Sequence, residues 1–359
     1  MNIFLGIDTS NYTTSIAVVN YNQGVICDFR QLLEVKKGCR GIRQSEAFFR
    51  HSQNLTHIWS EIVQKTDLEK IKAIGVSTTP RRVENSYMPV FTAGMHFAKN
   101  IGNALGIPVY EFSHQEGHIK SGEFDLLSSE REQLDFKDDH FIVFHLSGGT
   151  SEVLEVMRNH NFQKNKVPYI CKIIGGSKDI SFGQLLDRIG VAMGCEFPAG
   201  RYIDKSALAY ECKPGKASFS EKVNKLLKPI ETHKKIYKNS SFVNISGFET
   251  SIQRLLSELD KLEKEFAVNR EGKLPKKEIY NYIAYTVLDE ISDTLEKFIN
   301  VIQNSYKNMN IILIGGVSES CFIRNRILQK CSNVFFGKNG RDNGIGVALL
   351  GGELWKLNS

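Results

Sequence analysis

The chain has 359 residues, of which 41% are hydrophobic, and its formal net charge is +6 at pH 7. A chain of this length can bury two separate cores, so we expect two lobes. Asp8 interrupts the apolar stretch after Met1, which argues against a signal peptide, and no apolar run reaches the length of a membrane span. The seven cysteines form no C-x-x-C pair, and we expect reduced, mostly buried thiols in a cytoplasmic protein.

Two turns rich in glycine and hydroxyl side chains each follow a short apolar strand. The first is Gly6 to Ser10 and the second is Leu146 to Thr150, and strand-like apolar spacing resumes after both. Small residues at a bend leave backbone amides free to face an anion, and hydroxyls add donors. We predict two phosphate-binding hairpins, whose candidate nucleotide-binding residues are Thr9, Ser10, Ser147, Gly148, Gly149 and Thr150.

The repetition of the hairpin indicates a duplicated α/β unit, with Asp8 and Ser147 at matching places. Two such loops that face one nucleotide across a cleft are the layout of the actin-like ATPase superfamily. We therefore predict an α/β protein with a two-lobed actin-like ATPase fold and duplicated mixed-sheet subdomains. We expect the first lobe to comprise residues 1–112 with 341–359, and the second residues 113–340.

Strand and helix patterns alternate between the two hairpins. Strands are predicted at Ile71–Ser77 and Val109–Phe112, and a helix at Phe91–Leu105 that ends before Gly106. The acidic stretch 123–140 is expected to be an exposed connection.

Residues 205–275 are polar and rich in lysine, which favours a helical insertion in the second lobe over a core segment. Between Lys213 and Lys238, eight lysines stand against two glutamates. Clustered lysines suit the phosphates of RNA, and a solvated surface segment accounts for them equally well. No motif in the sequence is typical of base recognition.

Apolar residues from Tyr280 to Ile302 recur at three- and four-residue spacing, which predicts a long amphipathic helix packed on a sheet. A buried strand at Ile311–Ile314 then ends at Gly315 and Gly316. In an actin-like fold the backbone here approaches the nucleoside, although an ordinary turn also uses two glycines. We include Gly315, Gly316 and Ser320 among the candidate nucleotide-binding residues.

The motif His114-Gln115-Glu116-Gly117-His118 places two histidines at i and i+4 on one helix face. They would be close enough to share a metal ion, which requires a third ligand, and a chance surface pair is the alternative. Asp342 precedes a small-residue helix near Ile345 and is predicted as that ligand. The predicted metal site is therefore His114, His118 and Asp342.

In their order along the chain, these motifs resemble those of the TsaD family of tRNA threonylcarbamoyladenosine synthases, formerly called glycoproteases. The resemblance covers nearly the whole chain. Its landmarks are Gly6 to Ser10, His114 to His118, Leu146 to Gly149, Asp179 to Gly183 with Asp187, Pro198 to Gly200, Ser246 to Phe248, Gly315 to Val317 and Asp342 to Gly344.

The resemblance implies transfer of a threonylcarbamoyl group from its adenylate to N6 of the adenosine at position 37 of tRNA. The implied cofactors are one divalent metal ion (Fe, Zn or Mg), bound through residues that match the predicted triad, and ATP or an acyl-adenylate. The implied partners are tRNA and a TsaB-like protein, and no association with a membrane is implied. Residues matching Ser147, Gly148 and Gly149 would line the phosphates, and the implied neighbours of the ribose and substrate are Asp179, Gly183 and Asp187. Gly200 is a further candidate nucleotide- or substrate-binding residue.

The chain departs from the family pattern at positions implicated in the reaction. The family reads Ser-Cys-Asp-Glu-Thr where this chain has Ser10 to Thr14, so Tyr12 and Thr13 replace two acidic residues. A tyrosine and a threonine cannot replace a carboxylate as general base at neutral pH. We therefore leave the catalytic residues unassigned and predict a divergent paralogue. Other departures are Thr150 for a histidine, Glu249 for a lysine, Ser320 for an asparagine, and Thr79 to Arg82 for Gly-Pro-Gly.

Three functions follow from these patterns. The preferred one is a metal-dependent transferase that moves a (threonyl)carbamoyl group from an adenylate to tRNA adenosine or a related acceptor. The alternative is a non-catalytic nucleotide-binding paralogue that acts as a partner or regulator. Metalloprotease activity is disfavoured because His-x-Glu-x-His is not the zincin spacing. Arg81 and Arg82 would suit an anionic substrate if they enter the cleft, and an exposed loop is the alternative.

Overall fold

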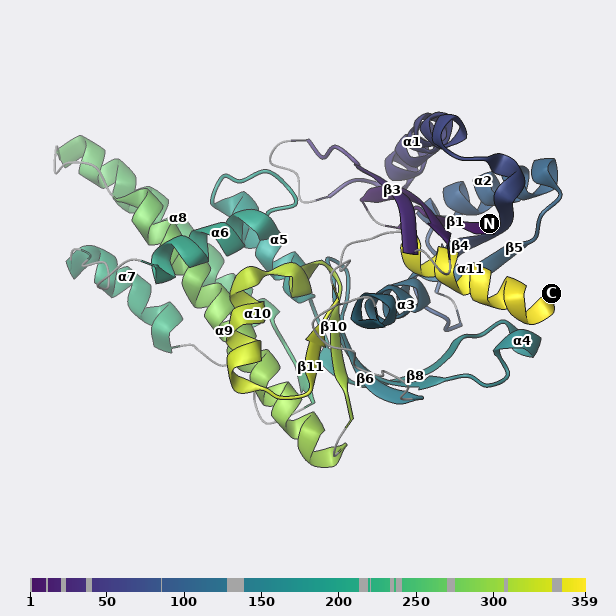
Figure 1. The fold of residues 1–359 in the computed structure, drawn as a ribbon. Coiled ribbons are helices and arrows are strands. Elements are labelled where there is room, and N and C mark those ends of the chain that lie inside the picture. The colour runs from purple at the N-terminus through teal and green to yellow at the C-terminus, as the bar shows by residue number, and fades with distance from the viewer. Residues whose placement is uncertain are drawn as a thin grey trace.

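The computed structural model describes residues 2–10, 12–20, 24–36, 41–84, 86–127, 139–212, 219, 221–232, 236, 241–269, 275–306, 309–337 and 344–359. Its elements form two β-sheets, with helices packed against the sheets and between them (Figure 1). No helix in these ranges is long and apolar enough to cross a membrane.

The two sheets repeat one arrangement. In the first, of order β3-β2-β1-β4-β5, the first three strands along the chain are antiparallel and β4 and β5 continue parallel to β1. In the second, of order β11-β10-β6-β7-β8-β9, β6 to β8 are antiparallel and β10 and β11 continue parallel to β6. The duplication is therefore confirmed, and the protein has the predicted two-lobed actin-like fold. The strands are β1 (Ile3–Asp8), β2 (Thr13–Asn20), β3 (Gly24–Leu32), β4 (Ile71–Thr79), β5 (Val109–Ser113), β6 (His140–Leu146), β7 (Ser151–Arg158), β8 (Tyr169–Ser177), β9 (Phe242–Val243), β10 (Ile311–Ile314) and β11 (Val334–Phe336).

The helices divide between the two sheets. Alternating apolar residues of the first sheet let α1 and α2 pack on one of its faces and α11 on the other. The helix α2 ends where predicted, because Gly106 adopts a left-handed φ of 65°. The helices are α1 (Gln44–Lys65), α2 (Val90–Leu105), α3 (His114–Leu127), α4 (Phe162–Asn165), α5 (Phe182–Ala192), α6 (Gly200–Glu211), α7 (Glu221–Thr232), α8 (Ser246–Asn269), α9 (Lys276–Ser305), α10 (Cys321–Lys330) and α11 (Ile345–Asn358), with 3-10 turns at Leu68–Lys70 and Gly316–Glu319.

The helices α3 and α11 lie between the two sheets (Figure 1). Ala348 of α11 packs in a core with the first sheet, whereas Val347 packs in a core with the second sheet and with Ile119 of α3. A Cβ atom built on Gly346 would lie 1.8 Å from the carbonyl oxygen of Gly117, so the two helices touch backbone to backbone. Since α11 packs on both sheets, its assignment to the first lobe remains a prediction.

The largest core lies behind the second sheet and corrects one expectation. The long helix α9 packs there with its predicted apolar residues, as expected. The segment 205–275 does form helices, but the prediction that it lies outside the core is wrong. Leu227 of α7 and Ile252, Leu255 and Leu259 of α8 are buried in this same core.

Two further expectations are wrong in part. The acidic stretch 123–140 begins inside α3, where Glu123 and Asp125 are buried, and residues 128–138 lie outside the described ranges. Glu123 is compensated by partners that the sequence pattern did not reveal: it accepts hydrogen bonds from Arg158 at 3.2 Å and from Tyr169 at 2.7 Å. The six described cysteines are free thiols, as predicted, but none of them is fully buried.

Candidate functional site

The first histidine of the predicted metal site opens helix α3 directly after strand β5. A capping box fixes this helix start: the Ser113 amide donates to Glu116 Oε2 at 2.6 Å, and the Glu116 amide donates to Ser113 Oγ at 3.2 Å. His114 is therefore the first residue of α3, and His118 follows one turn later on the same face.

The two histidine side chains converge in the interior. Their Nε2 atoms lie 3.0 Å apart, and both residues are buried, with 6% of His114 and 3% of His118 exposed. Two nitrogen ligands of one tetrahedral metal ion are about 3.3 Å apart when each bond is about 2.05 Å. The pair therefore fits two ligands of one ion, and the alternative of a chance surface pair is wrong.

The third predicted ligand, Asp342, lies outside the described residues. Among the residues that are described, no group of three or more His, Cys, Asp or Glu side chains is arranged to hold a metal ion. Another buried histidine close to this pair, His145, was missed by sequence reasoning. Its ring centroid lies 5.1 Å from that of His118 and 6.5 Å from that of His114. The sequence signal for His145 was its place at the end of the predicted strand before the Ser147 turn. Because His145 lies near His118, the Ser147 turn lies beside the histidine pair.

The second hairpin meets two other loops that contain candidate residues. A Cβ atom on Gly183 would lie 2.4 Å from the Ser147 carbonyl oxygen, and one on Gly315 would lie 2.3 Å from the Leu146 carbonyl oxygen. Only glycine permits these close approaches of backbone to backbone. The structure therefore brings together three segments far apart in the sequence. Open space instead surrounds the candidate positions Gly148, Gly149, Gly200 and Gly316, where an added Cβ would meet nothing within 4 Å.

Several predicted anion donors are bound to protein groups instead. The Gly149 and Thr150 amides donate to Ser147 Oγ at 3.3 and 3.0 Å, so they do not point freely outward. Thr9 Oγ1 donates to the Val90 carbonyl at 2.9 Å, and Ser10 Oγ donates to Asp8 at 2.5 Å. The role of Thr9 and Ser10 in nucleotide binding stays a prediction, because their hydroxyls would have to exchange partners.

Comparison with known proteins decides the family. The family model TsaD, described as tRNA N6-adenosine threonylcarbamoyltransferase, matches residues 30–345. The chain belongs to the TsaD family.

Relatives with the same description, tRNA N6-adenosine threonylcarbamoyltransferase, match nine tenths or more of the chain. The protein of Mycoplasmopsis synoviae is 25% identical over 361 residues, which cover 99% of this chain and 100% of the relative. That of Porphyromonas gingivalis is 26% identical over 329 residues, which cover 90% of this chain and 82% of the relative. That of Neorickettsia sennetsu is 22% identical over 331 residues, which cover 92% and 85%. The family is one of transferases.

Solved structures resemble the chain more weakly. The (R)-2-hydroxyglutaryl-CoA dehydratase component A of Acidaminococcus fermentans matches with a TM-score of 0.49 and 10% identity, covering 99% of this chain and 100% of the other. A ROK family glucokinase from Streptomyces griseus matches with a TM-score of 0.43 and 13% identity, covering 98% and 100%. The fold assignment therefore depends on the strand order and on the TsaD family match.

Two aspartates among the TsaD landmarks have distinct environments. Asp179 accepts hydrogen bonds from the amides of Ile180, Ile245 and Ser246 at 2.7 to 3.0 Å. Burial raises the pKa of Asp179, but these hydrogen bonds outweigh it and hold the pKa below the usual range. Asp179 therefore ties the end of β8 to the start of α8.

The other aspartate, Asp187, lies near the residue that departs from the family. Burial raises the pKa of Asp187 to about 6, against the lowering effect of the Ala199 and Gly200 amides. The Tyr12 ring packs on Phe197 with ring centroids 4.8 Å apart. Burial raises the pKa of Tyr12, and the charge of Asp187 adds to this, so the phenol stays protonated at neutral pH.

The raised pKa of Asp187 predicts a pH-dependent stability. Below the pKa of 3.8 of the unfolded state, the folded and the unfolded protein both hold the proton. Between this pKa and the folded-state pKa of about 6, the unfolded protein releases the proton and the folded protein retains it, so the free energy of unfolding falls as the pH rises. Asp187→Asn should therefore stabilise the protein at pH 7.5 by about 1–3 kcal/mol and have little effect near pH 4. Thermal melting of both proteins at the two pH values measures this difference. An equal offset at both pH values would contradict it.

Two other departures from the TsaD pattern have local partners. Glu249, in place of a lysine, pairs with Arg188 at 3.0 Å. Ser320, in place of an asparagine, donates to Asp204 at 2.5 Å and accepts from the Ile323 amide at the start of α10. Both side chains therefore have structural contacts, and nucleoside binding by Ser320 stays a prediction.

The arginines that follow β4 lie in a partly exposed loop and are ion-paired: 38% of the Arg81 side chain and 43% of the Arg82 side chain are exposed. Arg81 pairs with Glu152 of β7, and Arg82 forms a bidentate pair with Glu116 of α3 at 2.8 and 3.1 Å. Gln115 also donates to Glu152, at 3.2 Å. The two arginines therefore link the loop after β4 to α3 and to the second sheet.

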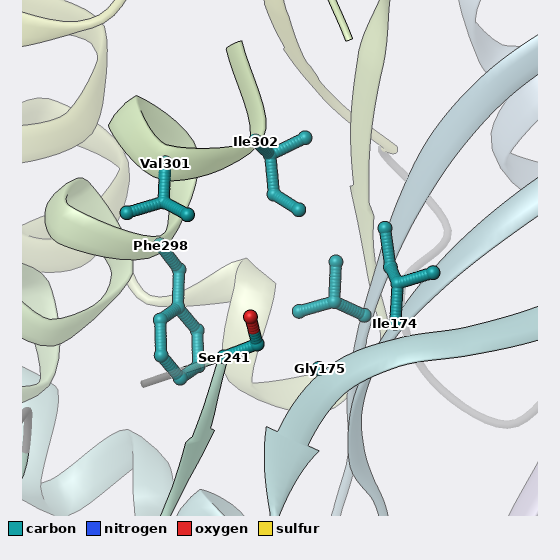
Figure 2. A pocket seen from close by; sticks show the side chains of 7 residues that line it. Ile174, Gly175, Ser241, Phe298, Val301 and Ile302 are labelled. Carbon is teal, nitrogen blue, oxygen red and sulfur yellow. The ribbon is translucent and has the colours of Figure 1, made fainter. Parts of the chain in front are cut away.

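A pocket elsewhere in the second lobe lacks the chemistry of an active site. Figure 2 shows Phe298, Val301 and Ile302 of α9 around it, with Ile174 and Gly175 of β8 opposite. Ser241 is its one polar side chain, and no ionisable side chain lines it. Ligand sites combine an apolar lining with convergent polar groups, so we do not assign this pocket a role in catalysis.

Proposed function

We propose that this protein transfers a threonylcarbamoyl group from an acyl-adenylate to a tRNA adenosine or a related acceptor in the cytoplasm. The observation that carries the proposal is the buried His114–His118 pair beside the Ser147 turn, in a chain of the TsaD family. Asp342 would complete the ligand set for one divalent ion. A TsaB-like protein is the proposed partner.

The ion, when bound, would supply Lewis-acid polarisation of the carbamate carbonyl. The chain's own residues would bind and orient the adenylate. Open space over Gly148, Gly149 and Gly316 would admit its phosphate and nucleoside. The Gly149 and Thr150 amides would exchange their contact with Ser147 Oγ for a phosphate oxygen, because an anion is the stronger acceptor. Arg81 and Arg82 would reach substrate only by leaving Glu152 and Glu116.

A non-catalytic role is the second candidate function. It is favoured by the packing of Tyr12 on Phe197, which puts an aromatic contact at a position where the family has a carboxylate. An assay of transfer to tRNA, with and without a TsaB-like protein, separates the two functions. Measurable transfer supports the enzyme, whereas nucleotide binding without transfer supports the partner or regulator.

Nucleotide binding is tested by Gly148→Val. An added side chain would meet no protein atom within 4 Å, and Gly148 does not have a left-handed φ, so the variant should fold normally. The valine would instead occupy the space proposed for phosphate. ATP or an adenylate analogue at 100 times its Kd should stabilise the wild type by about 2.7 kcal/mol, and Gly148→Val should abolish that shift.

Thermal melting with and without nucleotide makes the measurement, and two internal controls accompany it. The melting temperature of Gly148→Val without nucleotide, and its metal content, should equal those of the wild type. A normal nucleotide shift in this variant would refute the proposed phosphate site.

A further inference from the structure

A buried carboxylate at the end of β1 contacts the predicted metal site from the side opposite to His118. Asp8 is only 1% exposed, and its Oδ2 lies 2.8 Å from Nδ1 of His114. The other ring nitrogen of His114, Nε2, faces His118 Nε2. The two nitrogens of one imidazole therefore have different partners.

We propose that Asp8 is a positioning residue that holds His114 ready to bind the metal ion. This inference rests on the metal site of the proposed function. A carboxylate can only accept a hydrogen bond, so Asp8 fixes the proton of His114 on Nδ1. The lone pair is then on Nε2, the nitrogen directed at His118. The same contact makes the imidazole a better electron donor, as carboxylates do behind metal-bound histidines.

The carboxylate is itself held in one orientation by the first sheet. Asp8 Oδ1 accepts hydrogen bonds from the amide of Ser10 at 2.8 Å and from its hydroxyl at 2.5 Å. Ser77 at the end of β4 donates to Oδ2 at 2.6 Å. These three hydrogen bonds hold the buried carboxylate in one orientation. The ends of β1 and β4 thereby orient a ligand that α3 supplies.

Asp8 does not have the geometry of a ligand to the same ion. An ion bound at Nε2 of His114 lies across the imidazole ring from Nδ1, where Asp8 is bound. The inferred role is therefore orientation of His114. Removal of Asp8 should weaken metal binding and leave both histidines in place as ligands.

The test measures binding of Co²⁺ to the full-length protein by chelator competition and by its visible absorption spectrum. Asp8→Asn should lower the affinity about 10–100-fold and change the absorption bands, because His114 loses its fixed tautomer. Ser77→Ala, which removes one donor to Asp8, should have a smaller effect in the same direction. It keeps the inference testable if Asp8→Asn does not fold.

Thr14→Val is the matched control for Ser77→Ala. Like Ser77→Ala, it removes a buried hydroxyl that contacts another side chain, because Thr14 Oγ1 lies 2.8 Å from Nδ1 of His51, but it leaves Asp8 untouched. Its Co²⁺ affinity and spectrum should match those of the wild type. Melting temperatures without metal show how far each variant affects the fold alone.

Three results would overturn the inference. Unchanged Co²⁺ affinity and spectrum in Asp8→Asn would show that Asp8 does not act on His114. Complete loss of the ion, as severe as in His114→Ala, would identify Asp8 as a ligand. Absence of Co²⁺ binding by the wild type would overturn the metal site of the proposed function together with this inference, whereas the first two results leave that site intact.

Discussion

Replacement of His114 by alanine is expected to release most of the bound divalent metal from a protein that otherwise holds roughly one ion per chain. When a site of three protein ligands loses one of them, it loses a large part of its coordination energy. A water molecule replaces the imidazole poorly. The buried environment strengthens this expectation, because 94% of His114 is shielded from solvent. His118→Ala and Asp342→Ala should have the same effect.

Elemental analysis after dialysis measures the bound metal. The helix start should survive His114→Ala, since the capping box is formed by Ser113 and Glu116. His57→Ala is the control: this histidine on α1 has a side chain that is 70% exposed, and its removal should leave the metal content unchanged. Wild-type metal content in both His114→Ala and Asp342→Ala would rule out the site.

The second large effect concerns the missing acidic residues. The wild-type chain should transfer the group too slowly to restore threonylcarbamoyladenosine in cells that lack their own synthase, although it binds metal and nucleotide. General acid–base groups contribute about 10²–10⁴ in rate, and neither Tyr12 nor Thr13 supplies a carboxylate. The combined change Tyr12→Asp with Thr13→Glu should therefore raise the transfer rate measured with purified protein.

The structure also sets a limit on that gain. Tyr12→Asp removes the contact with Phe197, at a cost of about 0.5–1.5 kcal/mol, and brings a second carboxylate toward Asp187. Melting temperatures must accompany the rates. Tyr12→Phe with Thr13→Val is the control, because it alters the same positions without adding an acid and should give no gain. Full complementation by the unmodified chain would contradict the prediction and indicate a base at another position.

The sequence by itself determined the elements and their duplication. The apolar spacing that predicted α9, the Gly106 stop of α2 and the two matching hairpins are local patterns, and local backbone and side-chain preferences decide such features. The two histidines of α3 were predicted together for the same reason, because residues four apart on a helix share a face.

Only the tertiary structure decided which polar groups are buried and what they contact. The acidic composition around Glu123 predicted exposure, but Arg158 and Tyr169, from two strands of the second sheet, make its burial tolerable. In the same way, the polar composition of α8 predicted an insertion outside the core. Its apolar residues instead pack in one core with α9 and the second sheet.

The candidate site depends on such long-range pairs most of all. Asp8 and His114 are 106 residues apart, and Arg82 and Glu116 are 34 apart. Burial of a charge is costly unless a partner of matching chemistry lies within hydrogen-bond distance. No local pattern encodes that distance, because it is set by where the ends of β1, β4 and β5 meet in the folded chain.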